Sequence, residues 1–231
     1  TEAQYQQQVQ NKQAVDQKAA TIKTRIFNLL GVSKAPDFQE AYTIAKYASG
    51  ITGVRPALIL AILTQESNLG KNVGQCYLQD SDTGTGVKIS TGAASPKTMS
   101  PRQVPIFMSL TQQLGLDPYH TPVSCVIYYH GAPYGWGGAM GPGQFEPSTW
   151  ASGYSSRVAS ITGKTANPWN INDAFLATAL LLQDNGAAAN EFNAAMKYYC
   201  GGGCTSYDRF YGNSVISIAN QYEADIQAIG G

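Results

Sequence analysis

The sequence predicts a mainly α-helical fold interrupted by loops that are rich in glycine and aromatic residues. Three observations favour this fold class. Apolar residues recur at helical spacing in several segments; these segments start at helix-opening residues and stop at glycine; and two Gly-rich stretches separate them. With 231 residues and 43% hydrophobic content, the chain is long enough for one well-filled domain plus an appendage.

The first segment, residues 1–32, is polar and rich in Gln and Lys, which predicts an amphipathic helix rather than a core element. Its apolar stripe, at spacings of four and three, consists of Val15, Ala19, Ile22, Ile26 and Leu29. We expect this helix either to pack on its own domain or to form the tail of a longer coiled coil. A coiled coil would serve a secretion or phage-assembly partner, and the remaining residues, 33–231, would form one domain.

Six further helices are expected after this segment, each bounded by a start or stop signal. Pro36 and Pro56 suit the first turn of a helix, Asn172 and Asp173 are candidate N-caps, and Gly186 is a stop signal. The expected helices lie near residues 36–50, 56–69, 104–115, 173–185, 191–199 and 213–228.

Two stretches between these helices have a different character. Residues 74–100 are rich in Gly, Ser and Thr, and their segment DTGTGVKISTG predicts a small β-hairpin. Residues 117–150 carry much of the Gly, Pro and aromatic content. Long loops in a compact domain are usually functional or disordered, and aromatic residues such as Tyr134, Trp136 and Phe145 argue against disorder. We therefore expect these loops to build a binding cleft.

Charge and hydropathy exclude several classes of partner. Fifteen basic residues balance fifteen acidic ones, and no basic cluster is interleaved with aromatics, so nucleic acid is not an expected partner. The chain has no run of the roughly 18 to 20 apolar residues that a membrane-spanning helix needs. It opens at Thr1 without a signal-like apolar region, so we expect any export signal or anchor to lie upstream.

Four cysteines fit two disulfides and hence an oxidising compartment, although the number alone leaves three pairings open. Cys200 and Cys204 flank three glycines, a spacer flexible enough for the two sulfurs to meet. We expect Cys200 to pair with Cys204, and Cys76 with Cys125. The protein would then act in the periplasm, in the cell envelope or as a secreted product.

Metal sites are the alternative use of some of these residues. Zinc could use Cys125 with His120 and His130, but no fourth ligand at a typical spacing completes a tetrahedral set. Asp80 and Asp82 hint at calcium, yet no Glu stands at the twelfth position of an EF-hand loop. No metal or cofactor is therefore expected.

The segment PALILAILTQESNLG places Glu66 at the end of a helix that is apolar nearly all round and must be largely buried. The carboxyl group would lie where a dry core meets a wet surface. Partial desolvation there would raise the pKa of Glu66 and keep it protonated near neutral pH, as a general acid requires. The negative end of the helix dipole acts in the same direction. The alternative is an ordinary solvated glutamate in a last turn.

A second motif, GGAMGPGQFEPSTW over residues 137–150, places four glycines within seven residues. Glycine lets a backbone approach a ligand closely, and Gln144 offers an amide donor and acceptor to a hydroxyl or acetamido group. No Lys-Ser/Thr pair follows, so this is not a phosphate-binding loop. Glu146 adds a carboxylate to this motif.

Together the motifs resemble the lytic transglycosylases, relatives of goose-type lysozyme that cut bacterial peptidoglycan, and in particular their membrane-bound B-type branch. QESNLG resembles the catalytic Glu-Ser motif of that family, and GAMGPGQF-PSTW resembles its Gly-Met-Gln motif. NPWNINDAFLATALLLQDNG resembles the downstream helix, and KYYCGG resembles the Tyr-Asn-Ala-Gly segment. The resemblance covers roughly residues 50–215 and implies a lysozyme-like α domain.

The resemblance also implies roles for single residues. Glu66 would be the catalytic acid and base, and Ser67 would orient it or a sugar substituent; Gln144 would bond the sugar. The other substrate-binding residues implied are Met140, Gly141, Phe145, Tyr134 and Tyr198. Simpler roles are a capping hydroxyl for Ser67, a core side chain for Met140 and a packed ring for Tyr198.

The resemblance implies cleavage of the β-1,4 bond between MurNAc and GlcNAc, with 1,6-anhydroMurNAc ends formed by one glutamate acting as acid and then as base. The alternative enzyme is a hydrolytic muramidase that uses a second carboxylate, for which Asp80, Asp82 and Glu146 are candidates. The alternative outside enzymes is a non-catalytic peptidoglycan-binding protein.

Overall fold

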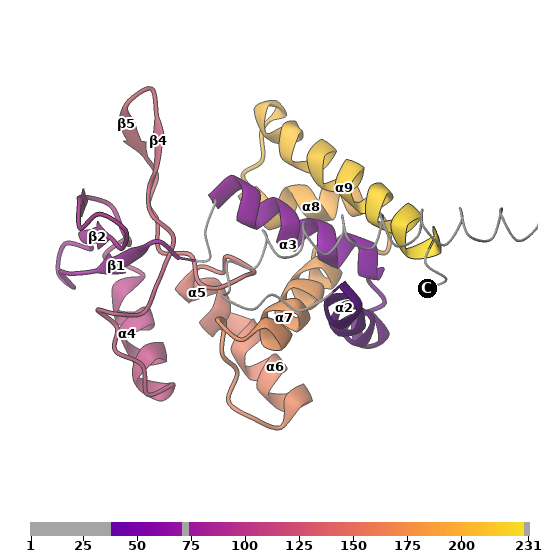
Figure 1. The fold of residues 1–231 in the computed structure, drawn as a ribbon, viewed down its shortest axis with the longest axis horizontal. Helices are drawn as coiled ribbons and strands as arrows, with labels where there is room; N and C mark the ends of the chain where they lie inside the picture. The colour runs from indigo at the N-terminus through magenta and orange to yellow at the C-terminus, as the bar shows by residue number, and fades with distance from the viewer. Residues whose placement is uncertain (1–37, 71–73, 229–231) are drawn as a thin grey trace, which may run out of the picture. The chain divides into compact units, whose positions relative to one another are not determined.

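The computed structural model describes residues 38–70 and 74–228, which are mostly helical (Figure 1). The helix expected over residues 1–32 lies outside this range. The chain divides into two compact units, Thr1–Gln65 with Leu182–Gly231, and Glu66–Leu181. Helices α3 and α7 each contribute residues to both units.

The described part of the first unit is helical. It contains α2 (Phe38–Thr52), α3 (Pro56–Gly70) as far as Gln65, the end of α7 (Ile171–Asp184), α8 (Glu191–Cys200), the short 3-10 helix η2 (Ser206–Asp208) and α9 (Arg209–Ala228). Its core includes two large side chains of α9, Tyr211 and Tyr222, which are fully buried.

An ion-pair network holds the start of α3 against the other helices of this unit. Arg55, just before α3, donates from Nε and Nη2 to the two carboxylate oxygens of Glu191 on α8, at 2.6 and 2.8 Å. Its Nη1 lies 3.3 Å from Glu223 on α9. A bidentate guanidinium–carboxylate pair fixes direction as well as distance, so α3 starts from a defined point.

The second unit combines a small sheet, a separate hairpin and several helices. Strands β1 (Cys76–Leu78), β2 (Gly86–Lys88) and β3 (Ala94–Ser95) pair antiparallel in that order. The hairpin consists of β4 (Ile127–Tyr129) and β5 (Ala132–Tyr134). The helices are α4 (Val104–Gln113), α5 (Pro147–Thr149), the π-helical turn η1 (Trp150–Tyr154), α6 (Ser155–Thr162) and α7 as far as Leu181.

The hairpin predicted for DTGTGVKISTG, residues 82–92, is present but shifted: β2 lies within this segment, whereas its partner β3 begins beyond it, at Ala94. Strand β1 adds a third strand. Two larger parts of the second unit were not predicted. The first is the β4–β5 hairpin. The second is the continuous helical run from Pro147 to Thr162, whose sequence is rich in Ser and contains Gly153. This run is held by Trp150, Tyr154 and Val158, which recur every four residues and are buried on one side.

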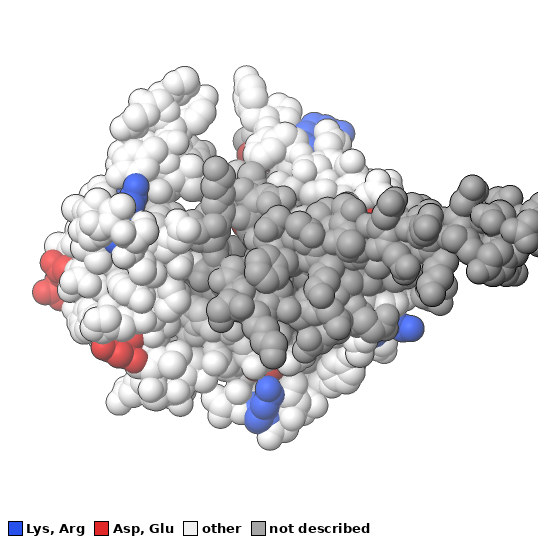
Figure 2. All heavy atoms as spheres, viewed as in Figure 1, with Lys and Arg blue, Asp and Glu red and all other residues white. Residues whose placement is uncertain are grey.

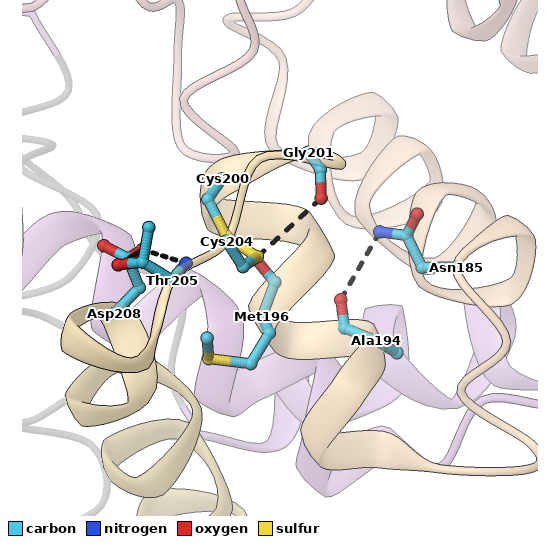
Figure 3. Close-up of a disulfide and its surroundings, with 8 residues drawn as sticks. All are labelled: Asn185, Ala194, Met196, Cys200, Gly201, Cys204, Thr205 and Asp208. Carbon is cyan, nitrogen blue, oxygen red and sulfur yellow. Dashed lines mark hydrogen bonds between the residues drawn. A yellow bond between two sulfur atoms is a disulfide. The ribbon is translucent and has the colours of Figure 1, made fainter.

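Two helices start earlier than predicted, and each start has a capping explanation. The N-terminal turn of α7 is bonded by Asn170, whose Oδ1 accepts from the backbone N–H groups of Asn172 and Asp173. The start of α9 follows a capping box in which Asp208 accepts from the N–H and the hydroxyl of Thr205 (Figure 3).

Both predicted disulfides, Cys76–Cys125 and Cys200–Cys204, are present. The first joins β1 to the chain that enters β4, and the second closes the turn after α8 (Figure 3). Because Cys125 is bonded to Cys76, it is not free to bind zinc. Within the described residues, no group of three or more His, Cys, Asp or Glu side chains is suitably placed for a metal ion.

In the described part of the chain, no single helix has the length and apolar character to cross a membrane.

Candidate active site

Helix α3 carries Glu66 out of the core, as the sequence predicted. Every residue from Ala57 to Leu63 is fully buried, and Thr64 and Gln65 are each 6% exposed. The side chain of Glu66 is half-buried. The carboxyl group therefore follows directly on a dry helical segment, at the point where the helix reaches the surface.

The two residues before Glu66 are hydrogen-bonded to α9. Thr64 Oγ1 donates to the Leu60 carbonyl and lies 2.8 Å from the Tyr222 hydroxyl, which must therefore be the donor in that second bond. The Ser214 hydroxyl donates to Gln65 Oε1 at 2.6 Å. These bonds fix the rotation of α3 immediately before its carboxylate. No local sequence signal pointed to this arrangement, because the partners lie about 150 residues along the chain.

The Gly-rich motif forms a tight closed turn. Met140 and Phe145 exchange two backbone hydrogen bonds, at 3.0 and 3.2 Å, and thereby close the loop over Gly141 to Gln144. Gln144 has a φ of 51°, a left-handed conformation that is uncommon for a residue with a Cβ. Four of the predicted site residues are thus brought together in one turn.

Glycine is required at position 141 because of what the turn packs against. A Cβ on Gly141 would lie 1.9 Å from the Pro168 carbonyl oxygen, and the residue has a φ of 61°. The neighbouring Trp169 donates from Nε1 to the Pro122 carbonyl at 2.9 Å. The Gly-Met-Gln-like motif and the NPW segment, separated in sequence, therefore support each other within the second unit.

Gln144 is held by its own turn. Its backbone N–H and its side-chain Nε2 both donate to the Gly141 carbonyl, at 3.1 and 2.8 Å. Among the described residues, none donates to its Oε1. The side chain is half-buried, so the amide is oriented and retains an acceptor for a hydroxyl or amide of a ligand.

Met140 and Phe145 support the turn from inside. Met140 is fully buried and Phe145 is 3% exposed. The Phe145 ring lies 5.5 Å from Trp150 and 5.6 Å from Tyr154, centroid to centroid. These contacts anchor the turn on the start of the α5–η1 helical run, so in this structure both side chains hold the turn in place.

Glu146 follows the turn at the N-cap position of α5, with its side chain half-buried. Its carbonyl accepts from Trp150 N–H, but no described residue hydrogen-bonds or ion-pairs with its carboxyl group. Burial raises the pKa of Glu146 to about 7. A carboxyl group that retains its proton near neutral pH therefore lies two residues from Gln144.

The remaining predicted residues lie on other elements. Ser67 is on α3, directly after Glu66, Tyr198 is half-buried on α8 in the first unit, and Tyr134 is exposed on β5. The Asp80 carboxylate accepts hydrogen bonds from the backbone N–H groups of Thr83 and Asp82, which lower its pKa. Both bonds go to Asp80 Oδ1, which closes a turn within its own loop.

Comparisons with known proteins identify the family. The family model described as "Transglycosylase SLT domain" matches residues 3–197. A search of curated proteins found no match. Three solved structures, each 15% identical, match 93% of this chain. Two are the Escherichia coli lytic transglycosylase Slt35, in complex with bulgecin A (79% of that chain, TM-score 0.54) and with calcium (80%, 0.54). The third is a 36 kDa muramidase/transglycosylase (81%, 0.55).

These similarities confirm the lysozyme-like, mainly α fold that the sequence predicted. The family model extends over most of the chain and includes α3 and the Gly-rich turn. The chain therefore belongs to the transglycosylase SLT domain family.

Proposed function

We propose that this enzyme cleaves the β-1,4 bond between MurNAc and GlcNAc in bacterial peptidoglycan and leaves 1,6-anhydroMurNAc ends. The observation that carries the proposal is the position of Glu66. It is the first half-buried residue after a fully buried helical segment, in a chain of the transglycosylase SLT family. The motifs of the Gly-rich turn support a place in the B-type branch.

Glu66 acts first as an acid and then as a base in this proposal. Its protonated carboxyl group donates to the glycosidic oxygen, and the N-acetyl group of MurNAc assists departure of the GlcNAc. The ionised carboxylate then takes the proton of the C6 hydroxyl of the same MurNAc, whose oxygen closes the anhydro ring. The proton given in the first step is recovered in the second, so the residue ends as it began.

The other site residues position the substrate. Gln144 Oε1 accepts from a sugar hydroxyl or amide, and Gly141 lets the turn that orients Gln144 pack against Pro168. Met140 and Phe145 act through the turn that they hold in place. Ser67, Tyr134 and Tyr198 are proposed as further contacts to the sugar or to the carboxyl group.

We place this activity outside the cytoplasm. Peptidoglycan lies there, and the two disulfides of the chain form and persist in oxidising compartments.

A second candidate function is a hydrolytic muramidase, and one specific observation favours it. Glu146 supplies a half-buried carboxyl group beside the Gly-rich turn, with its pKa raised to about 7. Hydrolysis would use it to activate water or to form a covalent intermediate, as paired carboxylates do in glycosidases. Only hydrolysis leaves a reducing MurNAc end, so the product separates the two functions.

The test is mass spectrometry of the soluble products released from purified peptidoglycan by the wild-type, Glu66→Gln and Glu146→Gln proteins. We expect wild-type muropeptides lighter than the reducing forms by one water, about 18 Da, none from Glu66→Gln, and anhydro products from Glu146→Gln. Reducing muropeptides that disappear in Glu146→Gln would establish the hydrolytic function instead.

A further inference from the structure

We propose that one face of the β4–β5 hairpin, formed by Ile127, Tyr129 and Tyr134, binds a strand of N-acetylated amino sugars outside the Gly-rich turn. We call these three residues the aromatic face. The proposal rests on the proposed function for the identity of the strand, and it adds a second binding surface at a distance from the reacting bond.

The register of the hairpin places these side chains together. Ile127 pairs with Tyr134, and Tyr129 pairs with Ala132. Residues directly opposite each other share a face of an antiparallel pair, as do residues two apart on a strand. The Tyr129 and Tyr134 rings lie 6.2 Å apart at an angle of 57°. Ile127, Tyr129 and Tyr134 are 58%, 65% and 70% exposed, so the aromatic face is open to solvent.

The hairpin is a preorganised support. Its two-residue turn, His130–Gly131, has positive φ at both positions, as the type I′ turn that matches strand twist requires. At its base, Ser124 exchanges hydrogen bonds with Gly138 and Ala139 at 2.8 to 3.0 Å. The neighbouring Cys125 is disulfide-bonded to Cys76. The backbone of the hairpin therefore loses little conformational freedom on binding.

The chemistry of the aromatic face fits an uncharged sugar. No Lys, Arg, Asp or Glu stands between Asp117 and Glu146 in the sequence, and the hairpin projects as an uncharged lobe in Figure 2. After the hairpin in the sequence, the ring of Trp136 has the Lys97 ammonium group 5.6 Å from its centre. Nucleic acids and anionic lipid surfaces are held mainly by Lys and Arg, which the hairpin itself lacks.

Tyrosine rings suit the flat side of a pyranose. The negative face of an aromatic ring attracts the weakly positive C–H groups of a sugar, and a phenol hydroxyl can bond a sugar hydroxyl or acetamide. Both features are present on the aromatic face, where Ile127 is the one large aliphatic side chain and the small Ala132 lies opposite Tyr129. An interface for lipid tails or for a permanent protein partner would expose more aliphatic surface.

The aromatic face also continues from the proposed substrate site. Strand β5 ends at Tyr134, and the chain reaches Met140 and the Gly-rich turn six residues later. Ser124 and Ala139 pair between the hairpin and that turn. Backbone hydrogen bonds therefore connect the base of the hairpin to the segment that leads into the turn of Gln144.

The test is cosedimentation with purified peptidoglycan sacculi, in a Glu66→Gln background so that the sacculi stay intact. Replacing Tyr129 and Tyr134 together by Ser should weaken binding about tenfold, the loss expected for two aromatic contacts. Replacing both by Phe should restore most of the binding and shows that the effect is not misfolding. The matched controls are Tyr128→Ser, on the opposite face of the hairpin, and Tyr207→Ser, on η2.

Equal binding by the parent and the Ser pair would overturn the proposal, as would equal loss in the Tyr128→Ser control. A parent that sediments with vesicles of phosphatidylethanolamine and phosphatidylglycerol but not with sacculi would overturn it in favour of a lipid surface. Failure of the proposed function is distinguishable, because it appears as no released muropeptides from the wild-type protein, whatever the binding result.

Discussion

Glu66 and Glu146 show how the same residue type acquires different chemistry from its position. Glu66 follows a fully buried helical segment whose preceding residues are bonded to α9. Glu146 occupies the N-cap position of the short helix α5, where its side chain makes no capping hydrogen bond and has no partner among the described residues. The carboxyl group of Glu66 is oriented by the helix that carries it, whereas the pKa of Glu146 is raised by burial alone. Glu146 holds a proton near neutral pH because burial partly excludes water from its carboxyl group.

Glu146 should make stability fall as pH rises. Its pKa is about 7 in the folded protein against 4.5 for an unperturbed glutamate, so the folded state binds more protons than the unfolded state between these pH values. The contribution of Glu146 to the free energy of unfolding is therefore fully present below pH 4.5. It is lost as the pH rises to about 7, by about 3 kcal/mol in total. Glu146→Gln should match the wild type at pH 4 and exceed it by up to that amount at pH 8, in urea unfolding.

The control for this experiment is Asp80→Asn. Hydrogen bonds from Thr83 and Asp82 lower the pKa of this exposed carboxylate, so its contribution is present above its unfolded pKa and is lost as pH falls. Any effect of Asp80→Asn should thus appear at neutral pH and vanish in acid. A Glu146→Gln difference that is constant from pH 4 to pH 8 would show that Glu146 titrates normally.

At the level of elements, α9 positions α3, the helix that carries Glu66. It contributes Tyr222 and Ser214 to the last buried turn of α3, and Glu223 to Arg55 at the start of α3. The buried part of α3, residues 57–65, presents Glu66 accurately only if both its translation and its rotation are fixed. Contacts at each end of the buried part of α3 meet that requirement.

Tyr222→Phe should reduce turnover more than stability. The change removes only the hydroxyl that donates to Thr64, so unfolding should become easier by about 1 kcal/mol. Because Thr64 lies two residues before Glu66, misplacement of the carboxyl group should lower kcat roughly tenfold, with KM little changed. The control is Tyr207→Phe, which alters an 88% exposed ring. A variant that loses stability but keeps its kcat would mean that Tyr222 is purely structural.

The elements also show which parts of the fold can be read from the sequence. Helices α2, α3, α4 and α8 lie close to their predicted positions because apolar periodicity and capping residues agree. The run from Pro147 to Thr162 was missed because only three well-spaced apolar side chains anchor it. The β4–β5 hairpin was missed because its strands are solvent-exposed and therefore lack a buried alternation.

For the candidate site, the sequence located the motifs but not their support. Glu66, Gln144 and the glycines were identified from residue type and resemblance. The contact of Gly141 with Pro168 and the bonds of Thr64 and Gln65 to α9 join distant parts of the chain. Such contacts depend on tertiary packing, for which a single sequence carries no local signal.

On the scale of the whole molecule, the covalent links differ in how much chain they enclose. Cys76 and Cys125 are 49 residues apart, whereas Cys200 and Cys204 are four apart. The first disulfide closes a loop that contains the β1–β2–β3 sheet and α4. The second closes a single turn after α8. In the chain-entropy account, the longer loop restricts the unfolded state more.

Replacing Cys76 and Cys125 by Ser should therefore lower the free energy of unfolding by about 4 kcal/mol, and replacing Cys200 and Cys204 by about 2 kcal/mol. The longer link also anchors the base of the β4–β5 hairpin beside the Gly-rich turn. We thus expect the first pair, and not the second, to lose peptidoglycan cleavage at temperatures where circular dichroism still reports a folded protein. Unfolding and cleavage measured on the same samples make the comparison. If the two pairs lost equal stability, or if cleavage in the Cys76/Cys125 pair persisted up to unfolding, the disulfide would not hold the site in place.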